Sequence, residues 1–142
     1  MRDEMPLKFS ISKDDKLVFT RHESLASMTD VRETYGTIFA QIADWGAATE
    51  IADMTATEIT GITPADMAYD AEELCTLCKK FGLEMRVVFV APDDGVFALM
   101  RVFATHASFK SAHCLNVVRN RQEAAEWLEI SLPRMEEKID AL

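Results

Sequence analysis

Polar and apolar positions alternate near the start of the chain, which predicts a β-hairpin. Phe9 and Ile11 alternate with serines, as in a half-buried strand. The polar segment 13–16 is typical of a turn, and an apolar second strand is expected at 17–20. Short apolar or β-branched runs farther along the chain predict three more strands, at 50–54, 85–91 and 115–119.

Between the later strands, apolar residues recur at helical spacing. One stripe runs from Val31 to Trp45, and a second runs from Met67 to Phe81. Thr63, which precedes a proline, is typical of the residue that caps the start of this second helix, and Asn120 is expected to cap the helix that follows it. The pattern therefore predicts helices at 31–45, 64–81, 95–109 and 121–128, and a tail helix within 131–142.

The order of these elements predicts an α/β fold. Strands that alternate with helices favour right-handed crossovers and a mostly parallel sheet. We expect a single domain with a central, mostly parallel five-stranded sheet, a leading antiparallel hairpin, and helices packed on the sheet. A chain of 142 residues has the usual length of one domain. Residues 1–130 would form this domain, and residues 131–142 would form a C-terminal tail helix.

The charge balance argues against several classes of partner. Fifteen lysine and arginine residues stand against 24 aspartate and glutamate residues, which gives a formal net charge of −9. An acidic surface repels phosphate backbones and anionic lipids, so we expect no nucleic-acid partner and no binding to a membrane surface. The longest apolar runs, such as 87–91, are too short to span a bilayer.

The N-terminal residues and the number of cysteines indicate a cellular compartment. The first four residues include two acids and no apolar run follows them, so the pattern does not resemble a signal peptide. Three cysteines are an odd number, which favours a reducing compartment over a disulfide framework. We therefore expect a cytoplasmic protein.

Cys75 and Cys78 form a Cys-x-x-Cys motif. A redox pair works best where a strand enters a helix, because the helix N-terminus lowers the pKa of the thiol. These cysteines lie more than two turns inside a predicted helix, near its apolar stripe, so we interpret them as small buried side chains. A zinc site would need two more ligands, and Cys114 with His106 or His113 fits no closed zinc pattern.

Asp53 follows a predicted strand, which is the place of the phosphate-accepting aspartate in receiver domains. Receiver domains also need an acidic pair after the first strand and a lysine after the last. Here Asp14 and Asp15 lie in a hairpin turn, and Arg119 ends the fifth strand. We therefore interpret Asp53 as a residue that caps the turn after its strand.

No catalytic set emerges from the remaining residues. Asp93 and Asp94 are adjacent acids, but both fit a turn and a helix N-terminus better than an acid–base pair. His22, His106 and His113 are too scattered to nominate a general base, and the chain has no glycine-rich phosphate loop. We expect no enzymatic activity, no metal and no other cofactor.

Two further groups of residues are candidates for binding. Arg119 and Arg121 flank the end of the last strand, where two guanidinium groups could hold an anion. The helix at 95–109 has more apolar surface than one sheet face covers, so we expect the tail or a second chain to cover the excess. A homodimer is our preferred interpretation, with its interface at Val96, Phe97, Met100 and Phe103.

Three segments of the chain form a recognisable series. The first is 51–55, which precedes a threonine-rich loop, and the second is 86–94, which precedes an apolar helix. The third is 116–120, which leads into the sequence Glu-Ala-Ala-Glu-Trp-Leu at 123–128. In this order they resemble the STAS-like group of bacterial proteins related to the SpoIIAA anti-sigma-factor antagonist. The resemblance covers residues 7–130.

The resemblance implies a small, non-catalytic regulatory domain that acts by binding a protein partner. Classical members carry a phosphorylatable serine within the motif Asp-Ser-Ser-Gly. The matching stretch here, 60–63, lacks that motif, and Thr60 or Thr63 would replace the serine as phosphate acceptor. The binding or switch loop is then expected to comprise Asp53, Thr55, Thr57, Thr60 and Thr63.

Two other classes of function stay open. Eight methionines and eight phenylalanines would suit a carrier of a small apolar or lipid-like ligand, or they would simply fill a core and a dimer seam. An enzyme that binds a divalent metal through Asp53, Asp93 and Asp94 is the third alternative. We prefer the regulatory binding domain, with the carrier as its alternative.

Overall fold

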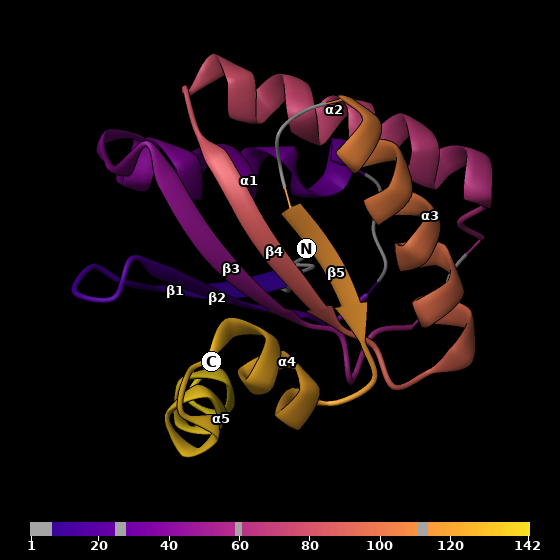
Figure 1. Cartoon of the computed structure of the whole chain (residues 1–142). Coiled ribbons are helices and arrows are strands. Elements are labelled where there is room, and N and C mark those ends of the chain that lie inside the picture. The colour runs from indigo at the N-terminus through magenta and orange to yellow at the C-terminus, as the bar shows by residue number, and fades with distance from the viewer. Residues whose placement is uncertain (1–6, 25–27, 59–60, 111–113) are drawn as a thin grey trace, which may run out of the picture.

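A five-stranded sheet forms the centre of the molecule (Figure 1). The computed structural model describes residues 7–24, 28–58, 61–110 and 114–142. The strands follow one another across the sheet in the order of the sequence; they are β1 (Leu7–Ser12), β2 (Leu17–His22), β3 (Ala47–Asp53), β4 (Glu84–Val90) and β5 (Cys114–Val118).

The strand directions are those expected from the sequence. β1 pairs antiparallel with β2, whereas β2 to β5 are parallel to one another. The fold is therefore a single-domain α/β fold with a leading antiparallel hairpin, as predicted. Along β3, Glu50 lies beside Val18 and Val87, while Ile51 lies beside Phe19 and Val88 on the opposite face.

Helices cover both faces of the sheet. Three helices that follow β2, β3 and β4 lie on one face, as expected when each crossover is right-handed (Figure 1). They are α1 (Met28–Ile42), which a 3₁₀ turn at Ala43–Trp45 extends, α2 (Pro64–Lys80) and α3 (Asp94–Lys110). The other face carries α4 (Arg121–Leu128) and α5 (Leu132–Asp140).

Each face of the sheet has its own hydrophobic core. The larger core lies between the sheet and α1 to α3, and the smaller core lies between the sheet and α4 with α5. Met135 and Ile139 of α5 are completely buried in the smaller core. The predicted tail helix is therefore an integral part of the folded unit.

Local capping interactions fix the start of three helices, as the sequence predicts. Thr63 and Asp66 form a capping box at the start of α2, in which each side chain accepts a hydrogen bond from the other's backbone N–H. Asn120 accepts from the N–H of Glu123 at the start of α4. Asp93 accepts from the N–H of Val96, so it caps α3.

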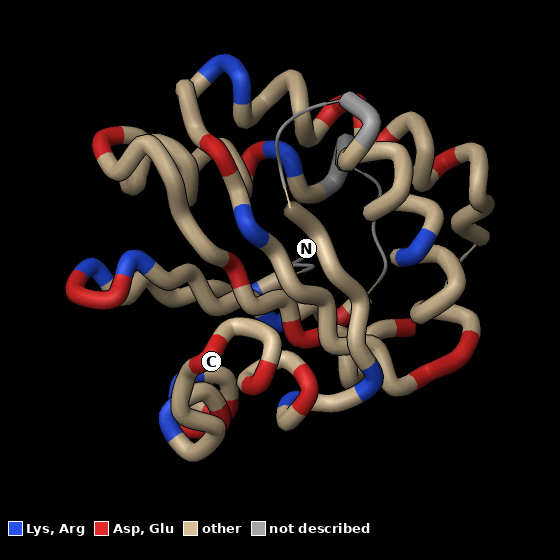
Figure 2. Tube along the Cα trace, viewed as in Figure 1, with Lys and Arg blue, Asp and Glu red and all other residues tan. Residues whose placement is uncertain are grey.

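β3 begins three residues before its predicted start and β2 ends two residues after its predicted end, and the extension of β2 matters for the site. β2 continues two residues past the predicted end, because Arg21 pairs with Asp53 of β3 and His22 pairs with Leu7 of β1. These pairings bring His22 into the sheet. Charged residues are spread over strands, turns and helices (Figure 2). In the part of the chain that the structure describes, no helix is long and apolar enough to cross a membrane.

Candidate functional site

A cluster of polar side chains is buried between the sheet and α1. Glu50 of β3, only 3% exposed, is its centre. The hydroxyl groups of Thr20 and Tyr35 both donate hydrogen bonds to Glu50 Oε2, each at 2.7 Å. His22 joins them, and we call these four residues the Glu50 cluster.

The strand pattern explains why these residues meet. Alternate residues of a strand point to the same face, so Thr20 and His22 both face α1. Glu50 lies beside Val18 in the parallel pair β2–β3 and therefore shares that face. Tyr35 belongs to the buried stripe of α1, and its hydroxyl reaches past the apolar side chains to the carboxylate.

The hydrogen bonds also define the state of His22. Its Nε2 lies 3.2 Å from Thr20 Oγ1 and 3.4 Å from the Tyr35 hydroxyl oxygen. Each hydroxyl has one hydrogen and directs it to Glu50, so the tautomer with a proton on Nε2 fits these two contacts best. Burial lowers the pKa of His22 to about 4, although the nearby Asp53 carboxylate opposes the change. The imidazole is therefore neutral at pH 7.

Burial shifts the two acids of the cluster in the same direction. It raises the pKa of Glu50, while the hydrogen bonds from Thr20 and Tyr35 partly offset that rise. Burial and the neighbouring Glu50 carboxylate raise the pKa of Tyr35 well above its ordinary value. Tyr35 thus stays protonated and remains a donor at any pH near neutrality.

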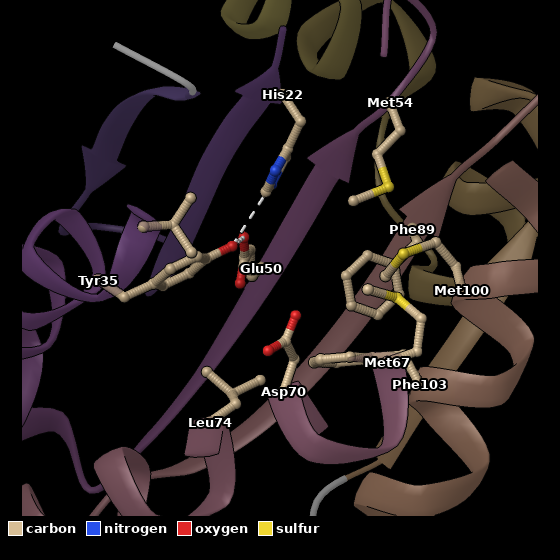
Figure 3. Close-up of a pocket in the computed structure, with 11 residues that line it drawn as sticks. His22, Tyr35, Glu50, Met54, Met67, Asp70, Leu74, Phe89, Met100 and Phe103 are labelled. Carbon is tan, nitrogen blue, oxygen red and sulfur yellow. Dashed lines mark hydrogen bonds between the residues drawn. The ribbon is translucent and has the colours of Figure 1, made fainter. Parts of the chain in front are cut away.

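A cavity of about 50 Å³ adjoins the Glu50 cluster (Figure 3). Its polar lining consists of His22, Tyr35, Glu50 and Asp70. The rest of the lining is apolar and comes from α1 to α3, β4 and the residue that follows β3; these residues are Val31, Met54, Met67, Leu74, Phe89, Met100 and Phe103. A few polar groups in an apolar enclosure are typical of small-molecule sites.

Asp70 adds a second carboxyl group from the opposite wall. It lies on α2, is 4% exposed, and points towards Glu50 (Figure 3). Among the described residues that line the cavity, none is a lysine or an arginine. The polar side of the cavity therefore combines two carboxyl groups with a neutral imidazole and a phenol.

The threonines of the predicted switch loop are held by the chain itself. Thr55 donates to Asp53 Oδ1 at 2.7 Å, and Thr57 donates to the backbone oxygen of His22 at 2.8 Å. Thr63 caps α2. Thr60 lies outside the described residues. Three of the four hydroxyl groups thus have structural partners, and Thr57 fixes the strand end that carries His22.

Asp53 is buried at the end of β3 and paired with an arginine. It is 2% exposed, and Arg121 Nη2 lies 3.3 Å from its Oδ2. Arg121 Nη1 also lies 2.9 Å from Asp140 Oδ1, so one guanidinium group joins β3, α4 and α5. This guanidinium group, predicted to contact an anion, binds two carboxylates of its own chain.

Arg119 is engaged in a similar way. Its Nη1 lies 2.6 Å from Asp94 Oδ1 and donates to the backbone oxygen of Pro92 at 3.3 Å. Its guanidinium group also lies over the ring of Phe97, 3.8 Å from the centroid. The predicted anion contacts at Arg119 and Arg121 are therefore occupied by residues that join elements of the fold.

The residues predicted to form a dimer interface lie mostly inside the single chain. Val96, Met100 and Phe103 are buried in the larger core, and Phe97 is partly buried beneath Arg119. The sequence predicts that the tail or a second chain covers the apolar surface of α3 that the sheet leaves open. In the structure α2 packs beside α3, so the apolar surface that seemed excessive is covered within the chain. Met100 and Phe103 line the cavity instead.

Sequence reasoning did not select the Glu50 cluster. In the sequence His22 is one of three scattered histidines, and Tyr35 is one position of an apolar helical stripe. One signal was available, because Glu50 occupies a strand that was expected to lie inside a sheet covered by helices. A carboxyl group in that position needs hydrogen-bond donors from neighbouring elements.

The remaining motifs add no site within the described residues. Burial raises the pKa of the Cys78 thiol to about 12, which keeps it protonated, and Cys75 Sγ lies 3.8 Å from the backbone oxygen of Ala107. No three histidine, cysteine or acidic residues of the described segments are placed to hold a metal ion. No family model and no curated protein matches the chain.

Proposed function

We propose that this chain is a non-catalytic binding domain that takes a small molecule into the cavity beside Glu50. The observation that carries the proposal is the cavity itself, where an apolar enclosure meets four convergent polar side chains. An apolar body would contact methionine and phenylalanine side chains. A polar group on the ligand would face His22, Glu50 and Asp70.

The size of the cavity limits the ligand. At roughly 10–15 Å³ for each water molecule, 50 Å³ holds about four waters. A molecule of about four non-hydrogen atoms therefore fits without displacing the walls. Met54, Met67 and Met100 are flexible side chains that can move to admit a somewhat larger ligand. A long acyl chain would require much more space, which favours a compact ligand over a lipid.

Support for a regulatory protein-binding role rests on the family resemblance. The features assigned to that role are used within the chain, since the described loop threonines hold backbone or carboxyl groups. Arg119 and Arg121 likewise bind internal acids. The small-molecule role is therefore the better supported of the two.

The proposed function can be tested with 1-propanol, a neutral probe of four non-hydrogen atoms. At the ceiling of about 1.5 kcal/mol per atom, such a ligand binds no more tightly than tens of micromolar. NMR titration of isotope-labelled protein suits this range. We expect saturable shifts at amides around the cavity.

Two variants at one position provide the control. Met100→Phe should fill the cavity with a stiff ring and weaken propanol binding at least fivefold, whereas Met100→Leu keeps an aliphatic side chain and should bind within about twofold of the wild type. Absence of saturable shifts in the wild-type protein would refute the proposed function. So would equal binding by the Met100→Phe variant when its spectrum shows the native fold.

A further inference from the structure

The two carboxyl oxygens of Glu50 have different surroundings. Oε2 accepts hydrogen bonds from Thr20 and Tyr35, each at 2.7 Å. Among the described residues no hydrogen bond reaches Oε1, yet none of their fully buried side-chain oxygen or nitrogen atoms is without a partner. Oε1 is therefore not enclosed by the core. It opens into the cavity that Glu50 lines, although the residue as a whole is only 3% exposed.

The surroundings of this oxygen favour a neutral carboxyl group. Burial raises the pKa of Glu50, and the hydrogen bonds from Thr20 and Tyr35 offset only part of that rise. The described lining residues include no lysine or arginine, and the imidazole of His22 is neutral at pH 7. An ionised Oε1 would face a mostly apolar space without a hydrogen-bond donor, which is costly.

The same hydrogen bonds indicate which oxygen carries the proton. The hydroxyl groups of Thr20 and Tyr35 both direct their hydrogens to Oε2, so a proton on Oε2 would meet two others. The acidic hydrogen of Glu50 therefore belongs on Oε1, at the cavity. With the proton of His22 on Nε2, the other three side chains of the Glu50 cluster use their donors within the cluster. The group that this cluster offers to a ligand is then the O–H of Glu50.

We propose that the cavity selects a compact, uncharged ligand with an oxygen acceptor, such as a short ketone, and that Glu50 donates the hydrogen on Oε1 to this acceptor. The inference rests on the proposed small-molecule function and adds the polar group of the ligand and its dependence on pH. A carbonyl oxygen accepts hydrogen bonds and donates none. The affinity for a ketone should therefore fall as Glu50 loses its proton.

The other titratable groups that face Glu50 were considered element by element. Above pH 5.5, His22 of β2 is neutral because burial lowers its pKa to about 4. Tyr35 of α1 and Cys78 of α2 stay protonated, because burial raises the pKa of the phenol well above its usual value and that of the thiol to about 12. Asp70 of α2 also lines the cavity and is tested by its own variant. The described lining residues of β4 and α3 carry no titratable group.

The test is an NMR titration with acetone, an acceptor-only probe of four non-hydrogen atoms, at several pH values from 5.5 to 8. We expect the dissociation constant to be at least threefold higher at pH 8 than at pH 5.5. Isopropylammonium has the same number of non-hydrogen atoms but is a cationic donor, and it should bind less tightly than acetone at pH 5.5. Contacts between acetone protons and the methyl groups of Met67 and Met100 place the bound ligand.

Isosteric variants assign the pH dependence to one residue. Glu50→Gln keeps a carbonyl oxygen for Thr20 and Tyr35 and presents an amide N–H donor at every pH. It should bind acetone with an affinity that changes less than twofold from pH 5.5 to 8. Asp70→Asn should keep the pH dependence of the wild type. Glu84→Gln is the surface control, because Glu84 is an exposed residue at the start of β4, and it should behave as the wild type.

The outcomes separate this inference from the proposed function. If 1-propanol binds but acetone does not, or if acetone binds equally at every pH, the acceptor proposal is wrong and the small-molecule function stands. If neither probe shows saturable binding, both are wrong. The acceptor proposal is also overturned if isopropylammonium binds more tightly than acetone at pH 5.5, or if the pH dependence persists in folded Glu50→Gln or disappears in Asp70→Asn. Should Glu50→Gln fail to fold, Asp70→Asn and isopropylammonium decide.

Discussion

Glu50 lies on a central strand with its carboxyl group facing the helices, where Thr20 and Tyr35 both donate to one of its oxygens. Burial of a carboxyl group inside a core is costly unless hydrogen bonds compensate for the lost water. A fully apolar side chain at this position would avoid the cost. The proposed small-molecule function would account for a carboxyl group at this buried position.

The protonation of His22 gives a prediction at the same scale. Its pKa is about 4 in the folded protein and 6.5 in an unfolded chain. Between these values the unfolded state binds more protons, so the free energy of unfolding should fall as pH decreases from 6.5 to 4. The full effect is about 3 kcal/mol, from roughly 1.4 kcal/mol per pKa unit.

Protonation of Glu50 changes the free energy of unfolding in the opposite direction over part of this pH range. Its pKa is raised in the folded state, so protonation of Glu50 recovers stability as pH falls. The His22 contribution is therefore measured as a difference between wild type and His22→Gln, by urea denaturation at several pH values. His106→Gln, at an exposed position of α3, is the control. A wild-type pH profile that is parallel to that of His22→Gln would contradict the prediction.

At the residue scale, the sequence alone predicts only part of the Glu50 cluster. Alternation places Thr20 and His22 on one face of a strand, but it does not show that the strand continues to His22 or which helix residue faces it. Both follow from the pairing of β2 with its neighbours β1 and β3 and from the docking of α1. Contacts between residues far apart in the chain therefore decide the composition of the Glu50 cluster.

At the scale of elements, the guanidinium group of Arg121 links α4 and α5 to the sheet. Arg121 at the start of α4 contacts Asp53 of β3 and Asp140 of α5. The Asp53 side chain is 3% exposed and that of Arg121 is 21% exposed, so this pair is poorly solvated. Arg119 forms a comparable pair with Asp94, whose side chain is 94% exposed.

The different burial of Asp53 and Asp94 predicts that matched substitutions of their arginine partners lower the free energy of unfolding by different amounts. Arg121→Met leaves the buried Asp53 without its cation and should lower the free energy of unfolding by about 3–5 kcal/mol. Arg119→Met leaves a hydrated acid and should cost about 1 kcal/mol or less. Chemical denaturation of both variants measures the difference. Equal losses would show that burial of Asp53 does not set the strength of its pair.

Helix caps could be predicted from the sequence, whereas the packing of one helix beside another could not. Thr63, Asp93 and Asn120 cap helices as expected, because capping depends on neighbours within a few residues. The prediction for α3 was different from the structure. Its apolar residues predicted contact with the tail or a second chain, because the sequence does not show that α2 packs beside α3. Residues expected to contact another chain consequently lie in the core or line the cavity.

At the scale of the whole molecule, the sheet separates two cores with different roles. The larger core contains the cavity and the Glu50 cluster, whereas the smaller core is closed by α4 and α5. β3 contributes to both, with Glu50 facing one core and Ile51 the other. The smaller core thus packs behind the strand that carries Glu50.

The contribution of the C-terminal helix to this support can be measured. Met135 and Ile139 are completely buried against the sheet face that includes Phe19 and Ile51. Met135→Ala should lower the free energy of unfolding by about 2–5 kcal/mol, because it removes buried methylene groups and leaves a cavity. Glu136→Ala changes an exposed neighbour on the same helix and should stay within about 0.5 kcal/mol of the wild type.

Urea denaturation of both variants, followed by circular dichroism, provides the comparison. If residues 1–130 formed a complete domain, Met135→Ala would be as neutral as Glu136→Ala, and α5 would be dispensable. If α5 is integral to the fold, the Met135→Ala loss should be accompanied by faster amide exchange in β2 and β3, whose apolar residues α5 covers. That readout would connect the end of the chain to the strands that carry His22 and Glu50.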